Sequence, residues 1–286
     1  MTPERKRVLI AVKTYPTLSE KYDELVCTAG FLEDGSWIRL YPIPFRKLAD
    51  RNQYRKWEWI ELDLVKNERD FRKESYRPYD IDGEISIIKH IGTTPKEWIE
   101  RKQIVLKNVY TNMEELIAEA RNKDIGTSLA VFRPAEILDF YWEEDSREWD
   151  QTKLANVLAN VRQFNMFDTP EENAIRSQFT PVNKLPYRFK YKFKSAGGTI
   201  HNLMIEDWEL GVLYFKYVHS GFSEIYACKK VKEKFFDNLV KKRDLYFFLG
   251  TSLKWHNVGV NPFMIIGVFY PPKEESESQP ILPLFD

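Results

Sequence analysis

The chain has 286 residues, of which 43% are hydrophobic, 30% charged and 15% aromatic. This length and composition are typical of a soluble globular protein with one large or two ordinary domains. The 43 basic residues balance 43 acidic ones, which excludes a histone-like protein that is basic over its whole surface.

Cysteine use and apolar runs predict the compartment. Cys27 and Cys228 are the only cysteines, so a disulfide scaffold is not indicated and a reducing cytoplasm is expected. The N-terminus MTPERKR leads directly into the short run VLIAV, without a targeting signal. The late apolar run 263–270 is too short to span a bilayer. We therefore expect a cytoplasmic protein without membrane contact.

Hydrophobic periodicity predicts an α+β fold with two domains, each a mostly antiparallel sheet with flanking helices. In the first half, the turn signal Glu33-Asp34-Gly35-Ser36 lies between strands expected at 24–31 and 37–43, which indicates a hairpin. Capping boxes begin at Thr94 and Thr111 and predict two helices. The charged segment 67–78 is expected to be a loop.

A domain boundary is expected where the charge changes sign. Residues 134–150 hold seven acids and one arginine, whereas residues 184–243 hold 13 Lys/Arg and 6 Asp/Glu. The expected parts are an N-terminal domain at 1–165, a connector at 166–183, a basic C-terminal domain at 184–272 and a disordered acidic tail at 273–286. The C-terminal domain should have strands at 187–194, 199–205, 244–250 and 263–269, with helices at 207–218 and 223–241.

The first expected C-terminal strand alternates aromatic and basic residues, YRFKYKFK from Tyr187 to Lys194. A strand places alternate residues on opposite faces, with about 6.6 Å between neighbours on one face. The aromatic face can therefore seal a core while the other face presents cations to a sugar-phosphate backbone. An edge strand protected by lysine would give the same pattern. The candidate nucleic-acid contacts are Arg188, Lys190, Lys192 and Lys194.

A second group of candidate nucleic-acid contacts surrounds the N-terminal hairpin. Lys13 and Arg39 are interleaved there with Tyr15 and Tyr41, and such a mixture can stack on bases and clamp phosphates. Ordinary hairpin packing would also account for these residues.

One imidazole and several carboxylates follow the basic strand. His201, Asp207 and Glu209 are candidate catalytic residues, because a nuclease needs carboxylates around Mg²⁺ or Mn²⁺. Asp207 at the start of a helix can instead be an N-cap. No phosphate-binding glycine motif and no zinc-binding spacing occurs, so no cofactor is expected outside the nuclease alternative.

The chain ends in ILPLFD after an acidic stretch. Isolated apolar residues in such a tail are typical of a docking peptide. The run resembles the peptides by which bacterial proteins dock on the replication sliding clamp, with Leu282, Leu284 and Phe285 at the matching positions. Ile281 stands where that pattern has glutamine. A tail that folds back onto its own domain is the alternative.

The phrases VCTAGFLEDGSWIRLYPIPFR, KLPYRFKYKF, DLYFFLGT and FMIIGVFYPP resemble an uncharacterised prokaryotic protein family, and this resemblance implies no activity.

Together these features predict a protein that binds nucleic acid, DNA in the first place, and docks a partner through its tail. Genome maintenance or defence against foreign DNA would fit this combination. A metal-dependent nuclease using Asp207 and Glu209 is one alternative. A protein–protein adaptor that uses its acidic segment and tail is the other.

Overall fold

The computed structural model describes residues 2–19, 23–43, 45, 48, 53–80, 83–162 and 181–273. Strands and helices are mixed in it, which confirms the expected α+β class. Within these residues no helix is both long and apolar enough to cross a membrane. The tail residues Leu282, Leu284 and Phe285 lie outside the described residues, as does most of the expected connector.

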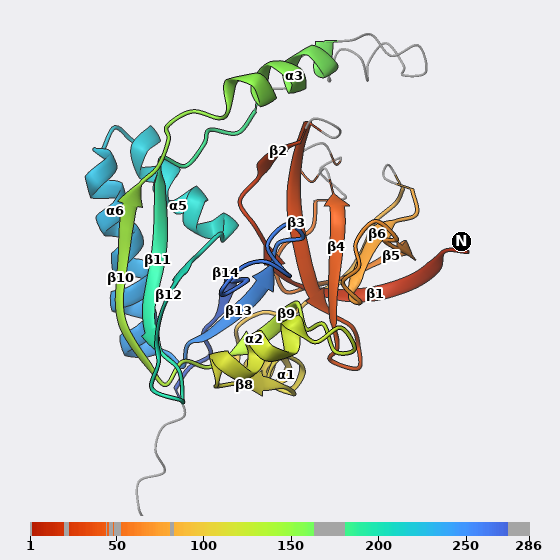
Figure 1. Ribbon diagram of the computed structural model, residues 1–286, viewed down its shortest axis with the longest axis horizontal. Helices are drawn as coiled ribbons and strands as arrows, with labels where there is room; N and C mark the ends of the chain where they lie inside the picture. Colours follow the sequence, from red (N-terminus) through yellow and green to blue (C-terminus); the bar gives the residue numbers. More distant parts are fainter. Residues whose placement is uncertain are drawn as a thin grey trace, which may run out of the picture.

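The N-terminal half is a small β-barrel (Figure 1). Five strands close a ring in the order β1-β3-β4-β6-β5, because β5 also pairs with β1. All neighbours in the ring are antiparallel except β4 and β6. The ring strands are β1 (Glu4–Lys13), β3 (Asp23–Phe31), β4 (Trp37–Ile43), β5 (Glu58–Lys66) and β6 (Ser75–Pro78). Two further strands, β2 (Thr17–Ser19) and β7 (Ser86–His90), pair with β3 and β5.

The expected hairpin is confirmed as β3 and β4. Gly35 has a φ of 84° in its turn, a conformation that favours glycine. Gly30 lies where β3 crosses β1, and a Cβ there would be 2.0 Å from the carbonyl oxygen of Leu9. The barrel interior is filled by buried aliphatic residues, among them Val8, Ile10, Ile38, Leu40, Ile60 and Leu62. The segment expected as a loop at 67–78 instead ends in β6, the strand that closes the barrel.

A helical connection joins the barrel to the second half. Helix α1 (Pro95–Val105) starts with the expected capping box of Thr94 and Glu97. Strand β8 (Val109–Tyr110) and helix α2 (Met113–Arg121) follow. Asn112, rather than the expected Thr111, caps α2, because its side-chain oxygen accepts from the main-chain N–H groups of Glu114 and Glu115.

The second half has two sheets with helices packed on them. One sheet has the order β10-β11-β12 and the other the order β14-β13-β9-β8. Their strands are β9 (Leu129–Phe132), β10 (Glu136–Glu144), β11 (Tyr187–Lys194), β12 (Ile200–Met204), β13 (Tyr246–Thr251) and β14 (Phe263–Phe269). The helices on these sheets are α5 (Trp208–His219), α6 (Glu224–Lys232), η3 (Glu233–Asn238) and α7 (Leu239–Lys242). Helix α3 (Gln151–Arg162) packs instead against β2 and β3 of the barrel, where Val157 and Leu18 are buried together.

Strand pairing divides the chain earlier than the sequence suggested. β9 pairs with β13, and β10 pairs with β11 along most of its length. Residues from about 109 onward therefore belong to the second half by hydrogen bonding, whereas the expected boundary lay at 166–183. Within the acidic segment at 134–150, which was expected to belong to the first domain, Glu136–Glu144 form β10, a strand of the second half.

The two halves share a core, so neither is an isolated unit. Val12 and Phe31 of the barrel pack in one buried cluster with Phe248 and Phe269 of β13 and β14. The Phe31 and Phe248 rings are 6.0 Å apart between centroids. In Figure 1, β13 and β14 lie between the barrel and the sheet of β10, β11 and β12. This contact positions the pocket described below.

Candidate functional site

The alternating strand has the two faces that its sequence predicts. Its aromatic residues are buried, and none of the four side chains is more than 4% exposed. The basic residues lie on the opposite face. β11 is the central strand of its sheet, between β10 and β12. Protection of a sheet edge therefore does not explain its lysines.

Acidic residues of the neighbouring strand face this basic row. Lys190 Nζ lies 2.6 Å from Glu143 Oε2, and Lys194 Nζ lies 3.0 Å from Glu136 Oε2. The Arg188 guanidinium is 3.9 Å from Asp145. For Lys192 no carboxylate of the described residues lies within 4 Å, although Asp139 is its cross-strand neighbour. The outer face of this sheet is therefore a band of paired charges.

Asp207 has the contacts of a structural residue. It is 2% exposed, and its Oδ1 accepts the N–H of Glu209 at 2.8 Å, as the N-cap of α5. Its Oδ2 accepts from Lys56 Nζ at 2.7 Å. Glu209 is more exposed and 3.8 Å from the same lysine. Both oxygens of Asp207 are thus engaged by groups of the protein itself.

His201 lies in a separate environment. Its Nε2 is 3.2 Å from Ser195 Oγ and 3.6 Å from a carboxylate oxygen of Glu114. Burial lowers the pKa of its imidazole. None of its recorded contacts is with Asp207 or Glu209. In the described part of the chain, no group of three or more His, Cys, Asp or Glu side chains is arranged to hold a metal ion.

The two cations predicted near the hairpin, Lys13 and Arg39, lie in different environments. Lys13 Nζ lies 4.1 Å from the centre of the Phe45 ring and 5.2 Å from that of Trp208, and it donates to the Tyr54 carbonyl. Burial lowers the pKa of Lys13 to about 8. Arg39 instead lines a large pocket on another side of the barrel wall.

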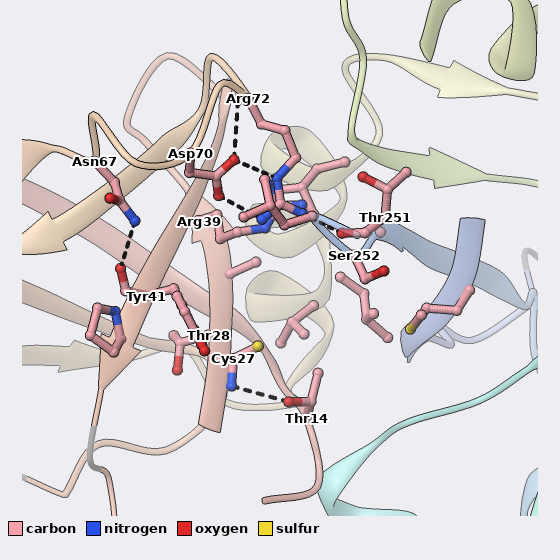
Figure 2. A pocket seen from close by; sticks show the side chains of 18 of the residues that line it. Thr14, Cys27, Thr28, Arg39, Tyr41, Asn67, Asp70, Arg72, Thr251 and Ser252 are labelled. Atoms are coloured by element: carbon pink, nitrogen blue, oxygen red, sulfur yellow. Dashed lines mark hydrogen bonds and ion pairs between the residues drawn. The ribbon is translucent and has the colours of Figure 1, made fainter. Parts of the chain in front are cut away.

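That pocket, here called the interdomain pocket, has a volume of about 970 Å³ and lies between the two halves of the protein (Figure 2). The barrel contributes residues of β1, β3 and β4 and the turn after β5, and the second half contributes residues of β13, β14 and the segment 204–206. Figure 2 shows Cys27, Thr28 and Thr14 on one side of it, with Arg39 and Arg72 on the other. A volume of this size is at the upper end of the range for ligand sites.

Two buried arginines join the halves along one wall. Arg39 donates from Nη1 to Ser128 Oγ at 2.9 Å and from Nη2 to the Ser128 carbonyl at 3.2 Å. Arg72 is held by Asp70, whose Oδ1 accepts from Nε at 2.8 Å, and Arg72 also donates to the carbonyl of Thr251. Burial lowers the pKa of Arg39 to about 10, which still leaves it charged at neutral pH. These arginines form a rigid wall.

The mouth of the pocket carries cations that are not paired with a carboxylate of the described residues, although Lys66 Nζ lies 4.5 Å from the centre of the Tyr76 ring and Arg77 donates to the Pro78 carbonyl. Lys66, Arg69 and Arg77 line the pocket and are at least partly exposed. We call these three residues the mouth cations. Among the described residues, none of the three has a carboxylate within 4 Å, although Glu68 lines the same opening. The side chain of Trp255, 52% exposed, adds an aromatic surface to the lining.

The floor of the pocket holds a carboxylate and a thiol. Glu206 and Cys27 both line it. Burial raises the pKa of each group. Within the described residues, the Glu206 carboxylate has no hydrogen-bond or ion-pair partner, and only its main-chain N–H is bonded, to the Ile265 carbonyl at 2.8 Å. The pocket lining therefore combines partly exposed cations with a carboxylate that has no protein partner among the described residues.

Among the predicted contact and catalytic residues that the structure describes, Arg39 lines this pocket, together with Tyr41 of the same predicted cluster. Sequence patterns alone assign no role to Glu206, Trp255 or the mouth cations. The only signal for the mouth was the density of charge in KNERDFRKESYR, residues 66–77. For Glu206 no such signal points to a pocket, because most other residues of the lining are distant along the chain.

Two family models match consecutive parts of the chain. A domain of unknown function (DUF8758) matches residues 4–107, and another domain of unknown function (DUF8757) matches residues 109–285. The second match spans more than half of the chain. The chain belongs to the DUF8757 family. The DUF8757 match begins at β8, in agreement with the strand pairing that assigns β8, β9 and β10 to the second half.

No curated protein matches the chain. Among solved structures, a murine DNA-binding protein bound with double-stranded DNA aligns with 96% of this chain and 100% of its own, at 8% identity and a TM-score of 0.30. A TM-score this low does not establish a shared fold, so nothing about the DUF8757 chain follows from it.

Proposed function

We propose that the protein binds nucleic acid, with the sugar-phosphate backbone against the mouth cations of the interdomain pocket. The observation that supports this proposal is that these cations have no carboxylate partner. Lys66, Arg69 and Arg77 line one large pocket. No carboxylate of the described residues lies within 4 Å of any of the three. Phosphates neutralise such groups and release counterions when they bind.

The mouth is a better phosphate site than the basic row of β11. A phosphate at Lys190 or Lys194 would compete with Glu143 and Glu136, which already lie within 3.0 Å of them. At the mouth no ion pair has to be broken first. The row of Arg188, Lys190, Lys192 and Lys194 remains a second proposed contact surface, with Lys192 its most available member.

Aromatic side chains near the mouth favour nucleic acid over a simple anion. Trp255 is exposed in the pocket lining, and Phe71, in the turn between Asp70 and Arg72, is 56% exposed. Bases stack on such rings whatever their sequence, while cations hold the backbone. Cations and exposed rings around one opening are therefore the combination expected for a single strand.

Several finer features belong to this proposal. The ligand is DNA, and the setting is genome maintenance or defence against foreign DNA in the cytoplasm of a prokaryote. The peptide Ile281 to Phe285, outside the described residues, docks the protein on a sliding clamp. The terminal resemblance at Leu282, Leu284 and Phe285 supports that docking step.

Fluorescence anisotropy with labelled 12-nucleotide single strands and duplexes tests the proposal. In 50 mM salt we expect the triple variant Lys66→Ala/Arg69→Ala/Arg77→Ala to bind at least about tenfold more weakly than the wild type, whatever the sequence. Lys190→Ala/Lys192→Ala/Lys194→Ala also removes three positive charges, but from the second proposed surface, and we expect it to weaken binding less than the mouth variant does. Equal affinity of the wild type and the mouth variant would refute the site.

A further inference from the structure

We infer that the interdomain pocket receives one nucleobase with two adjacent N–H donors, as guanine has, and that the Glu206 carboxylate binds these donors. This inference rests on the proposed binding at the mouth, because the mouth cations would hold the phosphates while one base enters the pocket. It adds a base preference to contacts that are otherwise independent of sequence.

The main chain holds Glu206 in a fixed position. Ile205 forms a parallel bridge with Ile265 of β14, and the Glu206 N–H donates to the Ile265 carbonyl at 2.8 Å. The next residue, Asp207, is the buried N-cap of α5. The main chain of Glu206 is therefore held on both sides, and its side chain is part of the pocket lining.

Glu206 is partly exposed in the pocket lining, and its carboxylate has no protein partner among the described residues. No described residue donates a hydrogen bond to it, and the apolar side chains of Val12, Met264 and Ile266 line the same pocket. Burial without a donor raises its pKa. Partial loss of water contact without a compensating donor still costs free energy. A ligand that brings two N–H groups would offset this cost.

The donor pattern of the bases selects guanine. A carboxylate only accepts hydrogen bonds, through two oxygens side by side. Guanine presents its ring N1–H next to its exocyclic amino group, so both oxygens are satisfied. Adenine and cytosine present an amino group beside a ring acceptor, and thymine presents one N–H between two carbonyls. Each of these places an acceptor against a carboxylate oxygen.

The size of the pocket agrees with this ligand. Sites for small ligands span roughly 300–1,000 Å³, and the interdomain pocket has about 970 Å³. A base with its sugar fits inside, and the phosphates then lie toward the exposed Arg69 and Arg77.

Single strands of twelve nucleotides test the inference. A dT strand with one central dG is compared with the same strand carrying dI, which lacks the exocyclic amino group, or dA. We expect the wild type to bind the dG strand about 10- to 100-fold more tightly than either, as for a good bidentate contact. Glu206→Gln, which replaces one acceptor by a donor, should abolish the difference. Glu84→Gln, an exposed glutamate outside the pocket, should keep it.

Equal affinity of the wild type for the dG and dI strands overturns the inference, and this outcome depends on no variant that could fail to fold. A preference for dG that survives Glu206→Gln overturns it as well. If all strands bind equally and the mouth variant binds none, the proposed function stands and the base pocket does not. If no strand binds, the proposed function fails. Guanosine and inosine monophosphates then probe the pocket alone, and equal or absent binding of the two rejects it.

Discussion

Arg39 of the barrel donates two hydrogen bonds to Ser128 of the second half, to its hydroxyl at 2.9 Å and to its carbonyl at 3.2 Å. The two residues are 89 positions apart in sequence. The same guanidinium lies 3.6 Å from Glu74, whose carboxylate also accepts from the Ser128 hydroxyl. This buried group fixes the two walls of the interdomain pocket relative to each other.

Replacing Arg39 should therefore destabilise the whole protein. Arg39→Met leaves the Glu74 carboxylate buried beside Ser128 without its cation, and breaking a buried pair in this way costs about 3–5 kcal/mol. Urea denaturation measures the change in the free energy of unfolding. Arg5→Met is the control, because Arg5 is an exposed arginine whose ion pairs are worth under about 1 kcal/mol. A loss below about 1 kcal/mol for Arg39→Met would contradict this role.

Because Lys56 and Asp207 form a buried ion pair, replacing either residue should lower the stability of the fold. Lys56→Met should cost several kcal/mol, roughly 3–5, because it leaves Asp207, only 2% exposed, without its cation. Asp207→Asn should be destabilising for the converse reason. We expect the double variant to lose less stability than the two single losses added together. If the losses in the free energy of unfolding are simply additive in this double-mutant cycle, the two side chains are not coupled.

The capping box of α1 should make the stability of the protein depend on pH. Hydrogen bonds from the Thr94 side chain and main chain lower the pKa of Glu97 to about 2. A carboxylate with a lowered pKa in the folded state contributes stability above its unfolded pKa of 4.5 and loses it as the pH falls toward 2. The stability difference between the wild type and Glu97→Gln should thus shrink over this interval. A difference that stays constant from pH 6 to pH 2 would argue against the cap.

Local sequence patterns predicted many helices and strands, because these elements depend on residues that are close in sequence. The alternation at 187–194 fixed which face of β11 is buried, since strand geometry alone decides it. The turn at Gly35 and the capping box at Thr94 are equally local. The acids that neutralise Lys190 and Lys194 come from β10, about 50 residues earlier. Their effect depends on the register of β10 against β11, which composition does not show.

The pocket was beyond prediction for the same reason. Cys27, Glu206 and Thr251 meet in its lining although they are spread over most of the chain. Closure of the barrel by β1 and β5, and its contact with β13 and β14, bring them together. The charged segment 67–78 was expected to be a loop. Only its fold as a turn and the strand β6, next to Lys66 of β5, places three cations in the lining of one pocket.

The central claim is phosphate binding at the mouth cations, and the salt dependence of single-strand affinity tests it most directly. Each neutralised phosphate adds about 0.7 to the slope of log affinity against log salt concentration. Removing Lys66, Arg69 and Arg77 should therefore reduce the magnitude of the slope by about 2. The variant of Lys190, Lys192 and Lys194 should change it less. An unchanged slope in the mouth variant, or a larger reduction in the β11 variant, would contradict the account.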